Sequence, residues 1–398
     1  MMTLILFVVI LSLLVFVHEF GHFLAARKMG MKVYEFAIGF PPLAIGVYRD
    51  PKTKKLVWVR GKKKVSRDTL TAGGGKETVE HAEYPATLYS LNWLPLGGFC
   101  KIKGENGEEG QSKDSFSGQK AWRRVLVLVA GVTMNFLLAA VLLGVGFMVG
   151  LPTDISRGMD PKAQLVEPAQ VIIQQVEQGS PAHDAGIQFG DKIVSLNNEP
   201  VQNSQQMTEY VRARADQLID VKVLRRIDGA DQELIIPVTP RVMDDQAKTP
   251  RLGVILADAA IVRYPWFTAI GKGFVAAFFG LINIFVSFYL LIKGLILGQG
   301  MAFDISGPVG IASVIGQSAQ LGIQYLINVT AMISLSLAAM NILPIPALDG
   351  GRVFFIVLEK IFRKPVPMRY EQMAHTIGFI LLLVLIVVVT TRDVAGLF

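Results

Sequence analysis

Two histidines and a glutamate lie within five residues of one another in the run His18-Glu19-Phe20-Gly21-His22. On a helix, residues four apart lie on nearly the same face, so both imidazoles could bind one zinc ion. Zinc lowers the pKa of a bound water towards about 7, and Glu19 could take the proton and pass it to a leaving amine. The five-residue pattern also occurs by chance in soluble proteins, so its surroundings must decide its meaning.

Those surroundings are apolar. Residues 3–26 form a run long enough to span a bilayer. A cleavable signal peptide is the alternative, but no basic stretch precedes the run and no small-residue cleavage site follows it. Ionisable side chains inside hydrocarbon cost about 2.5–3.5 kcal/mol each on insertion scales and normally mark function. We therefore expect a retained membrane span that carries a metal site.

A zinc hydrolase needs a third protein ligand and one open coordination position. Asp349 is the best candidate, because it ends another apolar segment and two glycines follow it. The alternative is that Asp349 only caps the helix that begins after it. Pro344 and Pro346 prevent a continuous helix just before it, so freed backbone groups could hydrogen-bond an extended substrate. Asn341 could orient that substrate, or it could simply satisfy the freed groups.

Composition excludes several other classes of protein. The chain has 398 residues, is 52% hydrophobic and has a mean hydropathy of +0.45, which is too apolar for an ordinary soluble enzyme. A single cysteine, Cys100, excludes an internal disulfide or a multi-cysteine metal cluster. His81, His183 and His375 have no partner at ligand spacing, and we interpret them as ordinary residues.

The net charge of +7 could suggest nucleic acid, but its distribution argues against that partner. Residues 27–124 carry 19 Lys/Arg against 10 Asp/Glu, whereas residues 151–265 carry 12 against 16. Basic residues close to membrane spans are typical of a cytoplasmic loop, and the more acidic segment is typical of an external domain. We predict a membrane protein with no nucleic-acid partner.

The predicted fold is a polytopic α-helical membrane protein with about four transmembrane helices, a membrane-associated β element and one inserted α+β PDZ-like domain. The predicted regions, in order, are a first transmembrane helix with the zinc motif (1–26), a cytoplasmic or membrane-associated β region (27–124), a second transmembrane helix (125–150), an external PDZ-like domain (165–242), an interfacial or partly embedded helix (266–298), a third transmembrane segment ending in a zinc ligand (325–349), a cytoplasmic loop or helix (350–373) and a fourth transmembrane helix (375–391).

Hydropathy alone would make residues 266–298 a fifth span. A full crossing there would place Asp349 at the membrane face opposite the histidines, roughly 30 Å away. A zinc–carboxylate bond is about 2 Å long, so the ligand geometry overrules hydropathy. We therefore expect this segment to lie along the outer interface, with Gln299 and Asp304 accessible from outside.

Six motifs occur in a specific order along almost the whole chain. They are HEFGHF in the first span, IGF at 38–40, LPLGGFCKI at 94–102, GVTMNF at 131–136, SGPVGIA at 306–312 and NILPIPALDGG at 341–351. With the PDZ-like stretch at 179–201, this combination resembles the bacterial site-2 proteases, intramembrane zinc metalloproteases of the regulator-of-sigma-E-protease type.

The resemblance implies that His18, His22 and Asp349 hold one zinc ion per chain and that Glu19 is the catalytic base. It also implies that residues 91–102, which include Gly97 and Gly98, form a β element that receives the substrate strand. Two features depart from the family. The gap between spans has room for one PDZ domain where some relatives carry two, and GFPP at 39–42 replaces a GFG-type turn.

The activity implied by the resemblance is hydrolysis of peptide bonds in the transmembrane segments of single-pass membrane proteins. These substrates would be anti-sigma factors or signal-peptide remnants already cut by another protease, within regulated intramembrane proteolysis. The implied location is the bacterial inner membrane, with the chain multi-pass in the lipid bilayer and the PDZ-like domain on the extracytoplasmic side. A non-catalytic zinc scaffold and an ion transporter are the alternative classes. Glu19 argues against the first, and the lack of paired broken helices argues against the second.

Overall fold

The computed structural model describes residues 2–61, 65–72, 75–82, 84–105, 112–155, 159–227, 230–243, 249–297, 307–364 and 366–395. Gln299 and Asp304, the positions expected to be accessible from outside, lie outside these described residues. The chain divides into two compact units. The first comprises residues 1–139, 277–316 and 330–398, and the second comprises residues 140–276 and 317–329.

Long helices and a small sheet make up the first unit. Its strands are β1 (Val33–Arg49), β2 (Leu56–Arg60), β3 (Val65–Ala72), β4 (Gly75–Ala82) and β5 (Leu88–Ile102). Its helices, some of which continue into the second unit, are α1 (Met2–Lys28), α2 (Ala121–Val149), α5 (Trp266–Ile296), α6 (Pro308–Leu321), α7 (Ile323–Ile342), α8 (Asp349–Phe362) and α9 (Met368–Ala395).

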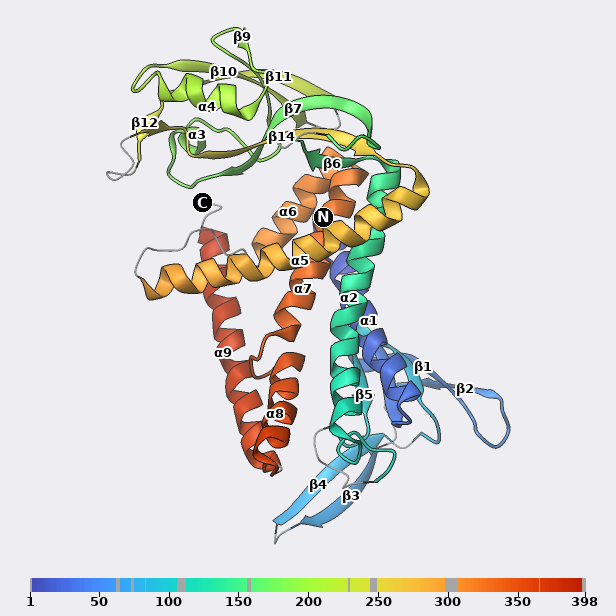
Figure 1. Cartoon of the computed structure of the whole chain (residues 1–398). Coiled ribbons are helices and arrows are strands. Elements are labelled where there is room, and N and C mark those ends of the chain that lie inside the picture. The colour runs from blue at the N-terminus through green and yellow to red at the C-terminus, as the bar shows by residue number, and fades with distance from the viewer. Residues whose placement is uncertain are drawn as a thin grey trace. The chain divides into compact units, whose positions relative to one another are not determined.

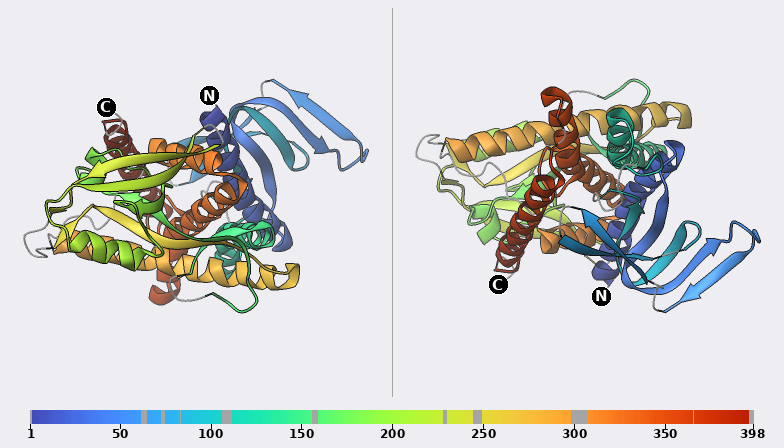
Figure 2. Two further views of the ribbon diagram at one scale, coloured as in Figure 1. Left: turned by 90° about the horizontal axis from the view of Figure 1, so that it is seen from above. Right: turned by 90° about the horizontal axis from the view of Figure 1, so that it is seen from below.

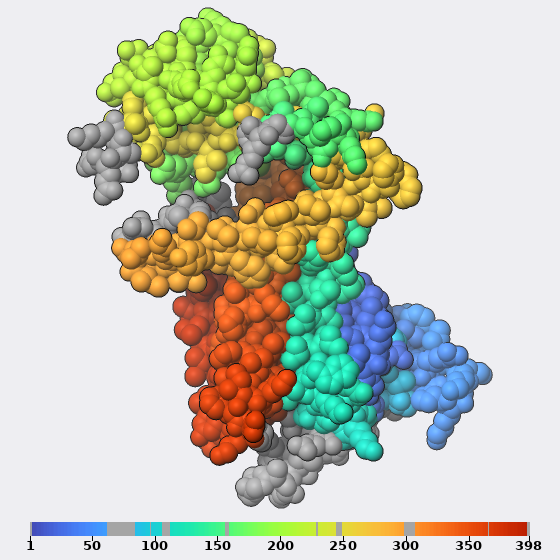
Figure 3. Space-filling view, in the orientation of Figure 1, coloured from blue at the N-terminus to red at the C-terminus, as the bar shows by residue number. Residues whose placement is uncertain are grey.

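Five helices within the described ranges, α1, α2, α5, α7 and α9, are long and apolar enough to cross a membrane. The predicted fold class, a polytopic membrane protein with a β element and an inserted PDZ-like domain, is confirmed. Within the first unit, α5 from residue 277 onward runs across α7 and α9 rather than alongside them (Figures 1 and 2). Figure 3 shows this part of α5 as an exposed rod. Whether four or five of the helices cross the bilayer stays a prediction.

Strands β1 and β5 are interleaved in the sheet of the first unit, whose strand order is β2-β1-β5. Phe36 of β1 pairs with both Cys100 and Tyr89, which belong to opposite ends of β5. The first half of β1 therefore lies between the two halves of β5. Figure 2 shows these strands extending beyond α1.

The sheet of the first unit is attached to α1 by apolar and polar contacts. The rings of Phe23 and Phe36 contact each other at a tilt, with centroids 4.9 Å apart, within a buried cluster that also contains residues of α2. The hydroxyl of Ser12 donates to the carbonyl of Pro95 at 2.6 Å, which ties the loop of β5 to the middle of α1. These contacts bring β5 beside the helix that carries the two histidines.

The second unit is built around a seven-stranded sheet with the order β11-β10-β8-β7-β14-β6, and β9 pairs with β8. Its elements are β6 (Leu151–Asp154), β7 (Gln164–Val176), α3 (Pro181–Asp184), β8 (Lys192–Leu196), β9 (Glu199–Pro200), α4 (Ser204–Arg212), β10 (Ile219–Ile227), β11 (Ala230–Val238), β12 (Arg241–Val242), β13 (Pro250–Arg251) and β14 (Val254–Arg263). The α+β organisation expected for residues 165–242 is present, and the sheet continues into β14 and β6.

A conventional apolar core holds the second unit together. Ile173, Val221 and Leu196 are almost fully buried in it. One buried ion pair accompanies this core: the Arg225 guanidinium donates to both carboxylate oxygens of Asp191, at 2.8 and 2.7 Å. The hydrogen bonds to Asp191 raise the pKa of Arg225 above its usual value. Because both charges are paired in a bidentate arrangement, the carboxylate is tolerated at only 1% side-chain exposure.

Candidate metal centre

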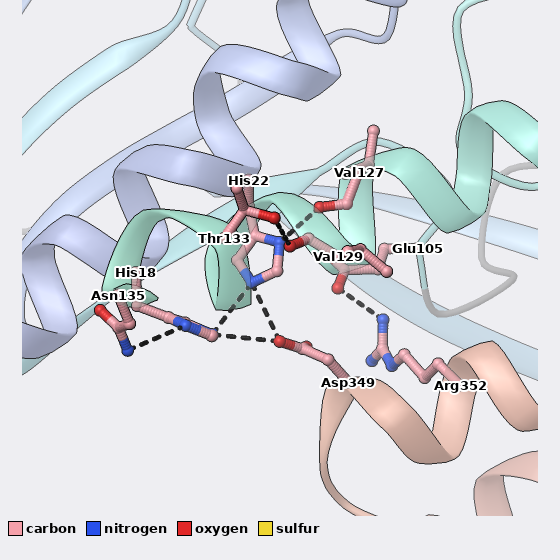
Figure 4. A network of polar contacts seen from close by, with 9 residues as sticks. All are labelled: His18, His22, Glu105, Val127, Val129, Thr133, Asn135, Asp349 and Arg352. Atoms are coloured by element: carbon pink, nitrogen blue, oxygen red, sulfur yellow. Dashed lines mark hydrogen bonds and ion pairs between the residues drawn. The ribbon is translucent and has the colours of Figure 1, made fainter. Parts of the chain in front are cut away.

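His18 and His22 lie one helical turn apart on the buried face of α1. Their Nε2 atoms are 3.1 Å from each other, and the two rings meet edge to face with centroids 4.7 Å apart (Figure 4). The i, i+4 spacing of the sequence thus puts both imidazoles at one point, as a helix requires. The rest of this face packs against α2, where Gly21 allows close contact with the Ala130 carbonyl.

Asp349, from the other end of the chain, meets the two histidines. Its Oδ2 atom lies 3.1 Å from Nε2 of His18 and 3.2 Å from Nε2 of His22 (Figure 4). Asp349 is not the N-cap of the helix that follows it. The N-cap of α8 is Leu348, and no side-chain hydrogen bond caps that helix. Asp349 is instead the first residue of α8 and points at the imidazoles.

Two ion pairs hold α8 in the place that delivers Asp349. Arg352, one turn into α8, pairs with Glu105 just after β5 (Figure 4). Glu359, two turns further on, accepts a hydrogen bond of 2.9 Å from Arg124 at the start of α2. Both pairs are largely shielded from solvent. The helix that carries Asp349 is therefore fixed both to the segment that follows β5 and to α2.

The far side of each imidazole is also held. Nδ1 of His22 lies 2.9 Å from the carbonyl of Val127, which can only accept, so Nδ1 carries the proton and Nε2 presents its lone pair. Nδ1 of His18 lies 3.4 Å from the amide of Asn135, whose oxygen is buried without a hydrogen-bond partner among the described residues. A half-turn of that amide lets its oxygen accept from Nδ1 of His18, which frees Nε2 in the same way.

Gly131 of α2 makes room for the imidazoles. A Cβ atom at this position would lie 2.5 Å from Nε2 of His22 and 2.8 Å from Cε1 of His18, which is closer than Cβ atoms come to neighbouring groups. Any larger residue would push the rings apart. The absence of a side chain at Gly131 therefore leaves room for the imidazole pair.

The three donor atoms fit a bound metal ion. Donors at about 2.0–2.2 Å around a tetrahedral ion are about 3.3–3.6 Å apart, close to the separations among His18, His22 and Asp349. Three electron-rich atoms at this distance repel one another unless a cation lies between them. The Asp349 Oδ2 atom is buried and accepts no hydrogen bond from the described residues, so a cation would satisfy it. Two histidines and one carboxylate form a zinc-type donor set with a fourth position left open.

Glu19 stands beside this donor set but outside it. It is half-buried, and its carboxylate interacts electrostatically with His18, His22 and Asp349. The group of ligand atoms that converge on one point does not contain it. A carboxylate next to a metal site, without being part of it, can contact a water at the open position.

The predicted substrate-binding residues fall into two places. Asn341 lies in the last turn of α7, and Pro344 and Pro346 lie in the turn between α7 and α8. Gly97 and Gly98 lie in β5, where a Cβ at Gly97 would meet the ring of Phe40 and one at Gly98 would meet the Ala37 carbonyl. Neither place is part of the three-ligand cluster, and their role in binding substrate stays a prediction.

Three residues near the cluster were not predicted to serve it. Asn135 and Gly131 entered the sequence analysis only as part of the GVTMNF motif, with no role at the metal site, yet they lie against the imidazoles. His375 was interpreted as an ordinary residue, yet its Nδ1 accepts a hydrogen bond of 2.8 Å from the backbone N–H of Ala347, two residues before Asp349. Asn135 carried a usable signal, because a buried amide within an apolar span needs a polar partner. The partner of His375 lies in another element and left no such signal.

Several helices apolar enough to span a membrane, with a three-residue group that could hold a metal ion and an adjacent carboxylate, fit a multi-pass membrane metallopeptidase. The chain belongs to Peptidase family M50, whose model matches residues 6–53 and 57–385. The resemblance to the site-2 proteases is thereby confirmed, and the chain is a zinc metalloprotease.

Relatives of similar length support the same assignment. A Clostridium acetobutylicum protein, named provisionally as a zinc metalloprotease, is 29% identical over 386 residues, which cover 96% of this chain and 94% of the relative. Zinc metalloprotease RasP of Geobacillus kaustophilus is 28% identical over 440 residues, which cover 98% of this chain and 97% of the relative. Among solved structures, the PDZ domain of an SdrC-like protein from Listeria monocytogenes covers 22% of this chain and 88% of that domain, at 20% identity and a TM-score of 0.20.

Proposed function

We propose that this chain is an intramembrane zinc endopeptidase that hydrolyses peptide bonds in the transmembrane segments of single-pass membrane proteins. The convergence of His18, His22 and Asp349 at 3.1–3.2 Å within apolar helices carries this proposal. The proposed stoichiometry is one zinc ion per chain. A site at this depth could act only on segments that enter or border the bilayer.

In this proposal His18, His22 and Asp349 hold the ion, and Glu19 is the general base. Zinc, when bound, supplies Lewis acidity that polarises the scissile carbonyl and makes a nearby water more acidic. The Glu19 carboxylate takes one proton from the attacking water as the new C–O bond forms. It then gives that proton to the amine nitrogen as the C–N bond breaks, so Glu19 ends the cycle unchanged. Val127 and Asn135 keep the imidazoles in the tautomer that the ion requires.

The substrate would be bound as an extended strand. The half of β5 from Gly98 to Ile102 pairs with β1 on one side only among the described residues, so its other edge can accept an added strand. The turn that contains Pro344 and Pro346 has backbone groups outside any helix, and Asn341 precedes it by one turn. Gly97 and Gly98 would let the substrate backbone approach closely. A peptide bond must be extended to be cut, because a helix shields its own carbonyls.

The proposed partners and location follow from the family resemblance and from the charge distribution. Substrates would be single-pass proteins trimmed beforehand by another protease, such as anti-sigma factors or signal-peptide remnants in regulated intramembrane proteolysis. The enzyme would lie in a bacterial inner membrane with its PDZ-like unit on the extracytoplasmic side. That unit would limit access by substrates that still carry bulky external domains.

Substitution of Glu19 by Gln tests the proposal directly. Glu19→Gln removes the base but no ligand, so we expect zinc content to stay at one ion per chain while cleavage falls by at least about two orders of magnitude. His22→Ala and Asp349→Ala should instead lower zinc content itself. Glu209→Gln, the same change on exposed α4, is the matched control and should retain full activity. Full activity of purified Glu19→Gln would refute the mechanism, and unchanged zinc in Asp349→Ala would remove that residue from the ligand set.

A further inference from the structure

The turn that delivers Asp349 has a strained backbone. Ala347 adopts a φ of +82°, a conformation that residues with a Cβ rarely adopt. Such a conformation is strained and persists only where surrounding contacts over-determine it. The contacts around this turn must therefore supply the constraint, and the carboxylate two residues later depends on them.

One of those contacts comes from α9. The N–H of Ala347 donates to Nδ1 of His375 at 2.8 Å. One turn further along α9, Gly378 accommodates the carbonyl of Pro346, where a Cβ would collide with it. On the opposite side, Gly350 and Gly351 admit backbone carbonyls of the same turn. The turn is thus held between α9 and the first turn of α8, and His375 makes the hydrogen bond that fixes its strained residue.

The other nitrogen of His375 shows that the ring is not there only to fill space. With Nδ1 accepting, the neutral ring carries its proton on Nε2, and that atom is buried without a hydrogen-bond partner among the described residues. A buried unsatisfied donor destabilises the fold. A leucine would fill the space beside Phe355, whose ring centroid is 5.8 Å away, without that cost. The acceptor at Nδ1 is the property that a leucine would lack.

We propose that His375 is a positioning residue of the metal centre: by accepting the Ala347 N–H, it fixes the turn that aims the Asp349 carboxylate at the two histidines. This role rests on the proposed function, since it needs Asp349 to be a metal ligand. His375 itself is not among the described ligand atoms that converge on one point. It acts through the backbone, at a distance of two residues from the ligand.

The test compares two substitutions that both remove the ring. His375→Asn keeps an acceptor oxygen near the position of Nδ1, whereas His375→Leu removes it. A cooperative melting transition of the full chain in lipid nanodiscs shows that each variant is folded. We expect zinc affinity, measured against a competing chelator, to fall by about 10–100-fold in the Leu variant and by less than about threefold in the Asn variant. His183→Leu, the same change at an exposed position, should match the wild type.

A second pair of variants tests the backbone part of the role. Glycine adopts a positive φ without strain, so Ala347→Gly should make the turn less dependent on its hydrogen bond. The loss of zinc affinity caused by His375→Leu should therefore shrink at least about threefold in the Ala347→Gly background. This double variant is also less strained, which keeps the comparison possible if His375→Leu alone does not fold.

The outcomes separate this role from the proposed function. Equal zinc affinities of His375→Leu and His375→Asn, or a wild-type affinity in the Leu variant, would overturn the positioning role while leaving the metal centre intact. Unchanged zinc affinity in His22→Ala would refute the metal centre, and the positioning role with it. None of these measurements depends on cleavage, so a failed choice of substrate cannot imitate either result.

Discussion

The two units of this chain place polar and apolar side chains in opposite ways. The first unit buries His18, His22 and Asn135 among its helices and exposes large apolar side chains along them. The second unit buries Ile173 and Val221 and turns its charged residues outward, apart from the paired Asp191. The second unit is therefore organised around an apolar core, whereas the first also buries polar groups among its apolar helices.

The difference follows from the solvent of each unit. In water, burial of apolar surface drives folding, so the second unit needs an apolar core. In hydrocarbon that force is absent between helices, and association depends on close packing of small residues and on polar contacts. Gly21 and Gly131 provide the close packing, and the hydroxyl of Ser334, which donates to the backbone carbonyl of Asn135 at 2.8 Å, provides a polar contact. The candidate metal centre lies among these close-packed and polar contacts.

The two sheets differ in the same way. The sheet of the second unit supplies most of the buried core of that unit. In the sheet of the first unit, Trp58, Leu91 and Trp93 remain 65%, 49% and 70% exposed. Exposed aromatic side chains next to a membrane span are typical of the bilayer interface. The exposed apolar face of the first sheet is therefore expected to contact lipid at the interface.

The largest effect is expected from a methyl group added at Gly131. Gly131→Ala should lower zinc affinity by at least about tenfold, because the Cβ would displace the imidazole of His22. Gly271→Ala is the matched control, since that helical glycine has open space around it. A chelator competition on purified protein measures both. Wild-type zinc affinity in Gly131→Ala would show that the interior of the first unit is not packed around its polar groups.

An effect on stability and not on zinc affinity, confined to the other unit, is expected from truncation of its core. Ile173→Ala should destabilise the PDZ-like unit by about 2–5 kcal/mol through lost burial and a residual cavity. Zinc content should not change, because no ligand belongs to this unit. Ile235→Ala, at a 62% exposed position of the same sheet, should cost less than about 0.5 kcal/mol. Limited proteolysis in urea measures both, and loss of zinc with Ile173→Ala would mean that the two units are not independent.

The smallest effect is expected at the exposed face of the first sheet. Trp58→Ala should change the free energy of unfolding in detergent by less than about 0.5 kcal/mol, because the ring contacts little protein. The same substitution should remove part of the tryptophan quenching caused by brominated lipids in nanodiscs. A destabilisation as large as that of Ile173→Ala would show that the ring is buried by protein, and the contrast between the two sheets would fail.

Features that lie within one helix or strand could be predicted from residue spacing. Features that depend on contacts between distant segments could not. His18 and His22 follow from the period of a helix, and the pattern around Asp349 singled it out before its partners were known. The interleaving of β1 with both halves of β5 could not be read from either strand, because each pairing joins residues more than forty positions apart. His375 was missed for the same reason, since its partner is the backbone of a turn 28 residues earlier. A sequence pattern indicates which face of its own helix or strand a residue occupies. It does not indicate which other element the residue contacts.

The metal centre joins residues that are made at very different times. Asp349 follows His22 by 327 residues. At about 5–20 residues per second, the ribosome completes the histidine pair about 16–65 s before it adds the third ligand. During that interval the nascent chain has only two of the three donors, and α8 with its ion pairs does not yet exist. The three proposed ligands can therefore come together only after most of the chain has been made.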